Sequence, residues 1–280
     1  MFRMLRFQMH DARRKPLTWL GLLLGMSFVL VFTLDIVRTA NDAGELINVL
    51  EPTIIMGSSA WNTLFLLLGV LLVLSDSPFL SDYTPAIVMR LSRKKWFLLQ
   101  IMYIMAVCIL YYFILSLFSV LLCLSIGFIE NAWSHFLYSI TTGDYAYRGY
   151  AIEFSNLRFM KEYNPMVAYV MTLLSQSIYA ITLELIIFLL NTYTRRGYGI
   201  CIAAFLHVLG YVIFLEGLVG FKKMSLMLHA LPALHAQQFY HGIGFAPTLF
   251  ESAIVFVIIN ATLVISLMIM SKRFDFIRKV

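Results

Sequence analysis

Six long apolar stretches divide the chain and restrict its fold more than any other feature. They occupy residues 17–34, 54–75, 98–126, 165–193, 197–215 and 252–271. Each is long enough to cross about 30 Å of hydrocarbon at about 1.5 Å per helical residue. Apolar residues follow one another without alternation, which argues against membrane-spanning strands. The sequence therefore predicts an all-α integral membrane protein, with six transmembrane helices in a single domain covering residues 1–280.

Composition and charge exclude a soluble globular protein and suggest an orientation. The chain is 61% hydrophobic and 13% charged, whereas soluble domains contain about 25% charged residues. With six spans both termini share one side, which holds 15 of the 21 Lys and Arg residues. The positive-inside rule then predicts that both termini are cytoplasmic. In a membrane protein the net charge of +6 reflects this sidedness, so we expect no nucleic-acid partner.

Three segments outside the spans have a predicted role of their own. Residues 1–16 form a basic, amphipathic pattern typical of a helix lying on an anionic leaflet, which makes membrane lipid a partner. Residues 76–97 form a cytoplasmic loop with a short apolar helix and a basic cluster. The outer segment 216–251 contains a moderately apolar run that Pro232 divides. That run is too short to span, and it predicts a re-entrant or interfacial helix pair.

The motifs of common enzyme and metal sites do not occur in the sequence. There is no GxxxxGK[ST] loop, no HExxH and no GxSxG. The cysteines lie inside apolar runs without a CxxC partner, which argues against a disulfide framework or a metal centre; they are Cys108, Cys123 and Cys201. We therefore expect no catalytic residue, no metal and no cofactor bound by this chain.

One acidic residue, Glu184, lies deep within a predicted span. A charge at that depth is costly and indicates function by default. Ser177, Glu184 and Asn191 recur at intervals of seven and so share one helical face. His207 in the next span lies at a similar depth, so a Glu184–His207 pair would neutralise both groups. Such a pair either holds helices together or takes part in transport.

Polar residues also mark the outer end of the second predicted span. Ser59 and Asn62 stand there among small residues, which indicates either close helix packing or a wetted cavity. The candidates for a substrate path are therefore Ser59, Asn62, Ser177, Glu184 and His207.

The whole layout resembles the permease subunits of ABC exporters in the ABC-2 membrane family. The resemblance rests on the basic N-terminal helix, six spans, the outer re-entrant segment and the 76–97 loop. In that loop Ser92-Arg93 match a family dipeptide, and Asp76 and Asp82 supply an acidic stretch before it. Gln100 stands where the family often has a Lys.

This resemblance implies partners and a coupling site. The loop would carry a coupling helix that docks on a separate cytoplasmic ATPase, present in two copies, which binds ATP and Mg²⁺. A second permease subunit, identical or paralogous, would complete the transporter. The residues expected to contact the ATPase are Asp82, Tyr83, Arg90, Ser92 and Arg93.

The resemblance also implies a cargo and a location. The chain is similar to permeases that export amphipathic peptides, such as phenol-soluble modulins, from a bacterial plasma membrane. Two other classes stay open at this point. One is an intramembrane enzyme that uses Glu184 and histidines, and the other is an immunity or sensor protein that needs no ATPase.

Overall fold

The structure is a computed structural model that describes residues 2–79, 87, 91–143, 156–194, 197–216, 221, 224–235, 247–272 and 274. In this part of the chain five helices are long and apolar enough to cross a membrane, in agreement with an all-α membrane protein. They are α2 (Pro16–Asp42), α6 (Arg93–Cys123), α9 (Pro165–Thr194), α10 (Tyr198–Leu215) and α13 (Leu249–Met270). Their 18 to 31 residues correspond to lengths of about 27–46 Å.

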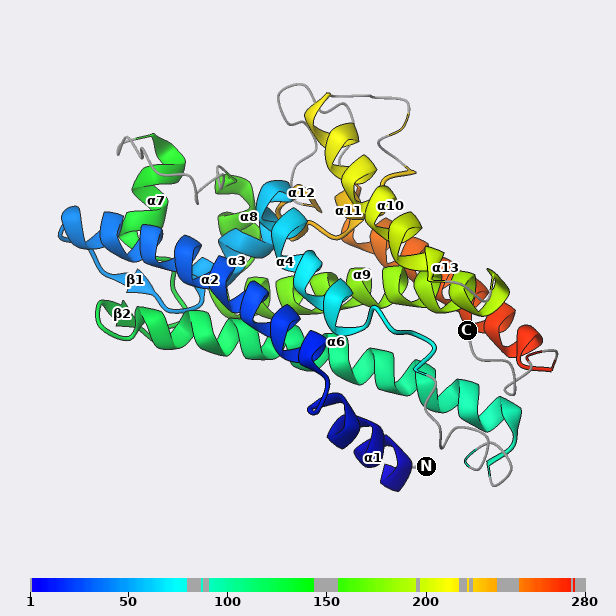
Figure 1. The fold of residues 1–280 in the computed structure, drawn as a ribbon. Helices are drawn as coiled ribbons and strands as arrows, with labels where there is room; N and C mark the ends of the chain where they lie inside the picture. The colour runs from blue at the N-terminus through cyan, green and yellow to red at the C-terminus, as the bar shows by residue number, and fades with distance from the viewer. Residues whose placement is uncertain are drawn as a thin grey trace.

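Shorter elements complete the described fold (Figure 1). The helices are α1 (Phe2–Ala12), α3 (Glu51–Ser58), α4 (Ala60–Val73), α7 (His135–Thr142), α8 (Leu157–Glu162), α11 (Leu226–His229) and α12 (Pro232–His235). The strands are β1 (Ile47–Asn48) and β2 (Gly127–Phe128). The two strands pair in parallel, with Ile47 opposite Gly127.

The predicted second span, residues 54–75, differs from one continuous helix. It contains most of α3 and all of α4, and these two helices meet at an angle of 94°. The 14 residues of α4 extend about 21 Å, which is less than the hydrocarbon thickness. Five continuous helices are therefore long enough to span, and the bent α3–α4 pair is either a broken sixth span or a re-entrant segment.

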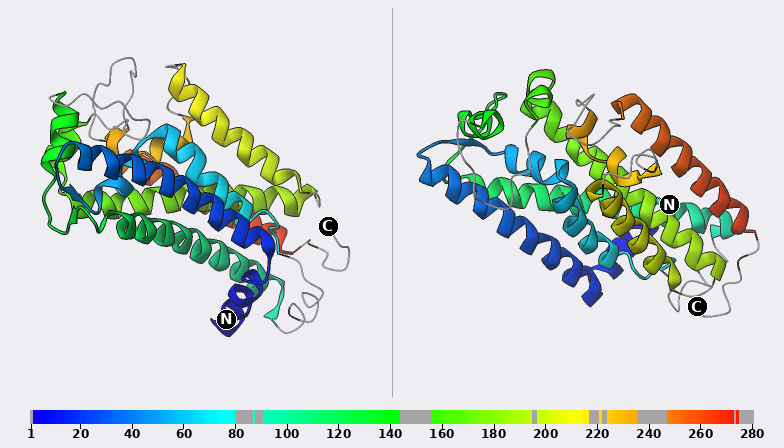
Figure 2. Two further views of the ribbon diagram at one scale, coloured as in Figure 1. Left: turned by 60° about the vertical axis from the view of Figure 1, so that its left-hand side comes forward. Right: turned by 90° about the horizontal axis from the view of Figure 1, so that it is seen from above.

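Helix α9 lies at the centre of the bundle. In its most apolar window 61% of the residues are buried, compared with 11% for α13. Helix α9 packs against α3, α6, α10 and α13, and Figure 2 shows α9 running between its neighbours. Polar side chains of α9 such as Gln176 and Glu184 are therefore buried inside the protein.

Glycines bring α2 and α4 into close contact. A Cβ on Gly69 would lie 2.6 Å from the Gly21 carbonyl oxygen, and a Cβ on Gly21 would lie 2.7 Å from Val73 Cγ2. Small residues at such a contact let two membrane helices approach closely, which increases their van der Waals attraction. The outer helix α2 is thereby held against the broken segment.

One end of the bundle gathers α1, the beginning of α6 and the end of α13 (Figures 1 and 2). Lys15 Nζ lies 3.3 Å from Asp76 Oδ2, and Arg93 donates a hydrogen bond to the Lys272 carbonyl at 3.2 Å. Trp96 stacks on Phe274 with ring centroids 6.5 Å apart. These contacts tie the two terminal segments to the same end.

The opposite end is closed by the strand pair and α7 (Figure 1). The buried Glu51 carboxylate accepts hydrogen bonds at 2.6 Å from both the Ser134 amide and the Ser134 hydroxyl. Asn48 donates to the carbonyls of Glu130 and Ala132 at 2.6 and 2.9 Å. These bonds fix the segment before α7 onto the beginning of α3.

Candidate functional site

The break between α3 and α4 places polar backbone inside the helix bundle. Ser59 interrupts the helix with extended backbone angles, φ −96° and ψ 132°. Its hydroxyl then accepts a hydrogen bond from the Asn62 amide at 3.4 Å and so begins α4. Ser59 and Asn62, two of the predicted path residues, are thus buried at the break, where one caps the helix that contains the other.

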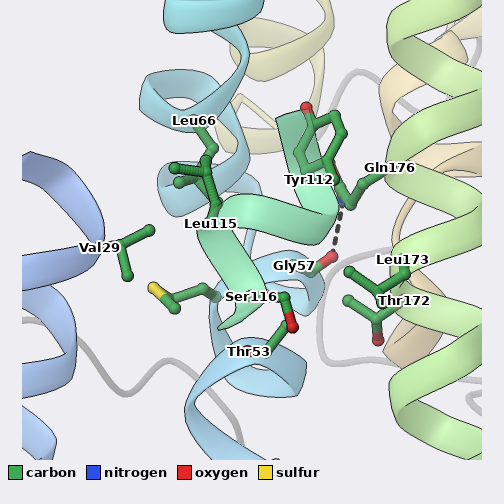
Figure 3. A pocket seen from close by; sticks show the side chains of 11 residues that line it. Val29, Thr53, Gly57, Leu66, Tyr112, Leu115, Ser116, Thr172, Leu173 and Gln176 are labelled. Carbon is green, nitrogen blue, oxygen red and sulfur yellow. Dashed lines mark hydrogen bonds between the residues drawn. The ribbon is translucent and has the colours of Figure 1, made fainter. Parts of the chain in front are cut away.

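Gln176 of α9 inserts its side chain into this break. Its Nε2 lies 2.7 Å from the Gly57 carbonyl oxygen, 3.2 Å from Thr63 Oγ1 and 3.3 Å from the Ala230 carbonyl oxygen. Figure 3 shows the bond to Gly57. The Gly57 carbonyl is one of those that lose their helical partner because α3 ends. A single amide therefore joins α9 to α3, to α4 and to the turn between α11 and α12.

A small cavity lies beside Gln176, between α2, α3, α4, α6 and α9 (Figure 3). Its volume of about 20 Å³ is enough for about one water molecule. Three buried oxygens belong to residues that line the cavity and have no hydrogen-bond partner among the described residues, namely Thr53 Oγ1, Tyr112 Oη and Gln176 Oε1. The site combines an apolar wall with unsatisfied polar atoms, and Gly57, near the end of α3, forms part of that wall.

A second polar chain crosses the bundle from α9 to α4. The Tyr179 hydroxyl lies 2.8 Å from His207 Nδ1, and His207 Nε2 lies 3.1 Å from the Leu64 carbonyl oxygen. Because a carbonyl only accepts, Nε2 carries the proton, and Nδ1 accepts from the tyrosine when the imidazole is neutral. His207 thus links three helices by hydrogen bonds.

The predicted Glu184–His207 pair does not form. Both ring nitrogens of His207 are taken by Tyr179 and Leu64. Glu184 is fully buried, and neither carboxyl oxygen has a hydrogen-bond partner in the described part of the chain. The two residues lie on adjacent helices at similar depth, but the rotation of α9 directs Tyr179 and not Glu184 at the imidazole. Glu184 stays a candidate without a described partner.

The other two residues on the Glu184 face are also buried. Asn191 donates to the Ser77 carbonyl at 2.6 Å and accepts from the Gly199 amide at 2.7 Å. It thereby joins the ends of α4 and α9 to the beginning of α10. Ser177 follows Gln176 directly and is 4% exposed. Asn191 therefore holds helices together.

The predicted coupling loop is described only in part, at residues 76–79, 87 and 91–97. Asp82, Tyr83 and Arg90 lie outside the described residues. Ser92 has a positive φ of 67° at the residue before α6. Arg93 is exposed at the beginning of that helix, beside the end of α13.

The predicted outer re-entrant segment contains two short helices, α11 and α12, on either side of Leu231. His229 of α11 lies 3.0 Å from Ser252 Oγ at the beginning of α13. Both helices are largely buried against the bundle. Residues 236–246 of this segment are outside the described part of the chain.

Sequence reasoning missed two residues whose hydrogen bonds join α9 to other helices, Gln176 and Tyr179. A glutamine inside a 30-residue apolar helix is a signal of the same kind as Glu184, and it could have been found. The role of Tyr179 depends on how α9 and α10 pair, which no sequence pattern reveals. Across the described residues, no three His, Cys, Asp or Glu side chains gather in a way that could hold a metal ion.

Comparison with known proteins identifies no relative: no protein-family model matches the chain, and no curated protein or solved structure does.

Proposed function

We propose that this chain is the membrane-spanning permease subunit of an ATP-driven exporter, and that it forms the path for a hydrophobic or amphipathic substrate. The observation that carries the proposal is the broken α3–α4 segment. Its Gly57 carbonyl has no helical donor and accepts a hydrogen bond from Gln176 of the central helix. Irregular backbone at membrane depth is tolerated where it is buried in protein or lines a water-filled cavity.

The polar groups around the break support a transport role. Discontinuous helices and buried polar side chains near the middle of a bundle are features of transporter binding sites. The break lies among five helices and borders the cavity that Thr53 and Tyr112 also line. In the proposal, Ser59, Asn62 and Ser177 lie along the path, and Gln176 closes it in the state described here.

The basic end of the bundle is proposed to face the cytoplasm and a partner ATPase. This end carries α1, the exposed Arg93 and the end of α13, which agrees with the positive-inside rule. Two ATPase subunits, which bind ATP and Mg²⁺, would dock on the 76–97 loop through Asp82, Tyr83, Arg90, Ser92 and Arg93. A second permease subunit would complete the assembly.

An amphipathic peptide, such as a peptide toxin or an antimicrobial peptide, is the proposed cargo. The spans are rich in methionine, with 15 in the chain, and flexible thioether side chains adapt to varied apolar partners. The proposed location is a bacterial plasma membrane.

The test is the recovery of a P-loop ATPase with a tagged chain extracted in mild detergent from its native membrane. Arg93→Glu reverses an exposed charge at the proposed docking site, so we expect it to reduce ATPase recovery at least tenfold. Lys161→Glu is the matched control, because Lys161 is also exposed but lies in α8, away from Arg93. Both variants must elute as monodisperse protein. Equal ATPase recovery with the two variants would contradict the proposed docking site, and no ATPase with any form would contradict the function.

A further inference from the structure

A cavity of about 190 Å³ lies between α1, α2, α4 and α6. Helix α1 lies at the end of the bundle where the chain begins (Figure 1). Most of its wall is apolar, with Met9 from α1, Leu22 from α2, Val73 from α4 and Ile114 from α6. The cavity is separate from the broken segment, and none of the residues in the proposed path lines it.

The cavity opens to the lipid-facing surface of the bundle. Two of its lining side chains, Trp19 and Leu110, are 53% and 41% exposed. The Trp19 indole also donates a hydrogen bond to the Arg13 carbonyl at 2.7 Å, which fixes the corner between α1 and α2. A bilayer acyl chain can therefore reach the cavity, and Trp19 lies at its edge.

Arg13 lines the same cavity and supplies a cation at its rim. Its two basic neighbours are engaged, because Arg14 lies 3.3 Å from His10 and Lys15 is paired with Asp76. No residue in the described part of the chain pairs with the Arg13 guanidinium, which is exposed. This end of the chain thus combines an apolar cavity with an available guanidinium.

The surrounding charge is positive in spite of two nearby carboxylates. Asp11 and Asp76 both lie near Tyr103, which lines the cavity. Lys15 neutralises Asp76, and the arginines of segment 2–15 outnumber Asp11; they are Arg3, Arg6, Arg13 and Arg14. An anionic group is therefore favoured at the rim over a neutral or zwitterionic one.

We infer that this cavity binds an anionic phospholipid of the surrounding leaflet, with an acyl chain against Trp19 and Leu22 and the phosphate at Arg13. The chain supplies both parts that such a ligand needs, an apolar wall and a guanidinium that binds phosphate by two parallel hydrogen bonds. The lipid would fix α1 against α2 and α6 at the junction between the interfacial helix and the first span.

Quenching of Trp19 fluorescence by brominated acyl chains tests this inference. The chain is reconstituted into phosphatidylcholine vesicles with a minority of phosphatidylglycerol, and the bromines are placed on one lipid or the other. The Trp19 signal is the difference between the unmodified chain and Trp19→Phe. One basic residue near an anionic lipid contributes about 1 kcal/mol, or about a fivefold enrichment. A given amount of brominated phosphatidylglycerol should therefore quench Trp19 to the same extent as about a fivefold larger amount of brominated phosphatidylcholine.

Arg13→Gln should remove this selectivity, and Arg14→Gln, the matched control, should retain it. Equal quenching by the two lipids at equal mole fraction would overturn the inference, as would equal losses in both variants. Protection of Trp19 from both brominated lipids would also overturn it, because protein would then cover the cavity.

High salt gives a check without any variant, since it should lower the selectivity of the unmodified chain for the anionic lipid. Selectivity that salt leaves unchanged would contradict a charge at the rim. The experiment uses no ATPase, so its failure would leave the permease proposal as it stands.

Discussion

Replacing Gln176 with leucine should destabilise the protein by disconnecting α9 from the broken segment. Leucine retains the approximate size of the side chain but removes the amide that reaches Gly57, Thr63 and Ala230. The loss falls mainly on the Gly57 carbonyl, because its 2.7 Å bond is the shortest of the three. That carbonyl lies at the end of α3, where no later helical amide can replace the donor.

The expected loss follows from the number of bonds that one amide nitrogen can serve. Its two hydrogens satisfy two of the three acceptors at a time. Hydrogen bonds between membrane helices contribute about 0.6 kcal/mol on average, and each buried acceptor left without a donor costs about 1–3 kcal/mol. We therefore expect Gln176→Leu to lower stability by about 2–3 kcal/mol. At about 2–4 °C per kcal/mol, its Tm should fall by about 4–12 °C.

The assay is the loss of the monodisperse peak on size-exclusion chromatography after heating in detergent, at one fixed heating rate. Gln100→Leu is the matched control, since it makes the same substitution at a fully buried position of α6. Neither amide atom of Gln100 has a hydrogen-bond partner among the described residues, so this substitution should be neutral or stabilising. A Tm for Gln176→Leu equal to or above that of Gln100→Leu would refute the reasoning.

Two further substitutions test other contacts by the same heating assay. Gly199→Ala would place a Cβ 2.6 Å from Asn191 Oδ1 at the beginning of α10, so we expect a clear loss of Tm and of monodisperse yield. Gly197→Ala, which meets no atom within 4 Å, should change neither, and equal behaviour of the two would contradict the packing described. Tyr179→Phe removes the hydroxyl that lies 2.8 Å from His207 and should cost about 0.6–1.7 kcal/mol; an unchanged Tm would show that this bond adds nothing.

Hydropathy located the long helices because their apolar runs are the physical requirement for crossing a bilayer. It placed the end of the first span at residue 34, whereas α2 continues to Asp42 through Asp35 and Arg38. Helical hydrogen bonds do not stop where the hydrocarbon ends, so apolar content alone underestimates helix length. Hydropathy also failed to locate the helix break. It predicts one span over residues 54–75, because Gly57, Ser58 and Ser59 barely interrupt the apolar character of that run.

The candidate site was predictable in its polar residues but not in their partners. Ser59 and Asn62 were chosen for their place in a span, and the structure puts them at the helix break. The proposed Glu184–His207 pair was based on matched depth, and it was wrong because depth does not determine the rotation of α9. Tyr179 occupies the position that the prediction gave to Glu184. Contacts between helices depend on crossing angle and rotation, which a single sequence does not encode locally.

The most direct test of the exporter proposal is ATP-dependent uptake of an amphipathic peptide by inverted membrane vesicles. The vesicles would come from cells that make the chain together with its ATPase, and from matched cells that lack only the chain. In inverted vesicles the cytoplasmic face is outside, so export appears as accumulation inside. We predict accumulation that requires both the chain and hydrolysable ATP. Equal accumulation with and without the chain, or accumulation that continues with a non-hydrolysable ATP analogue, would contradict the account.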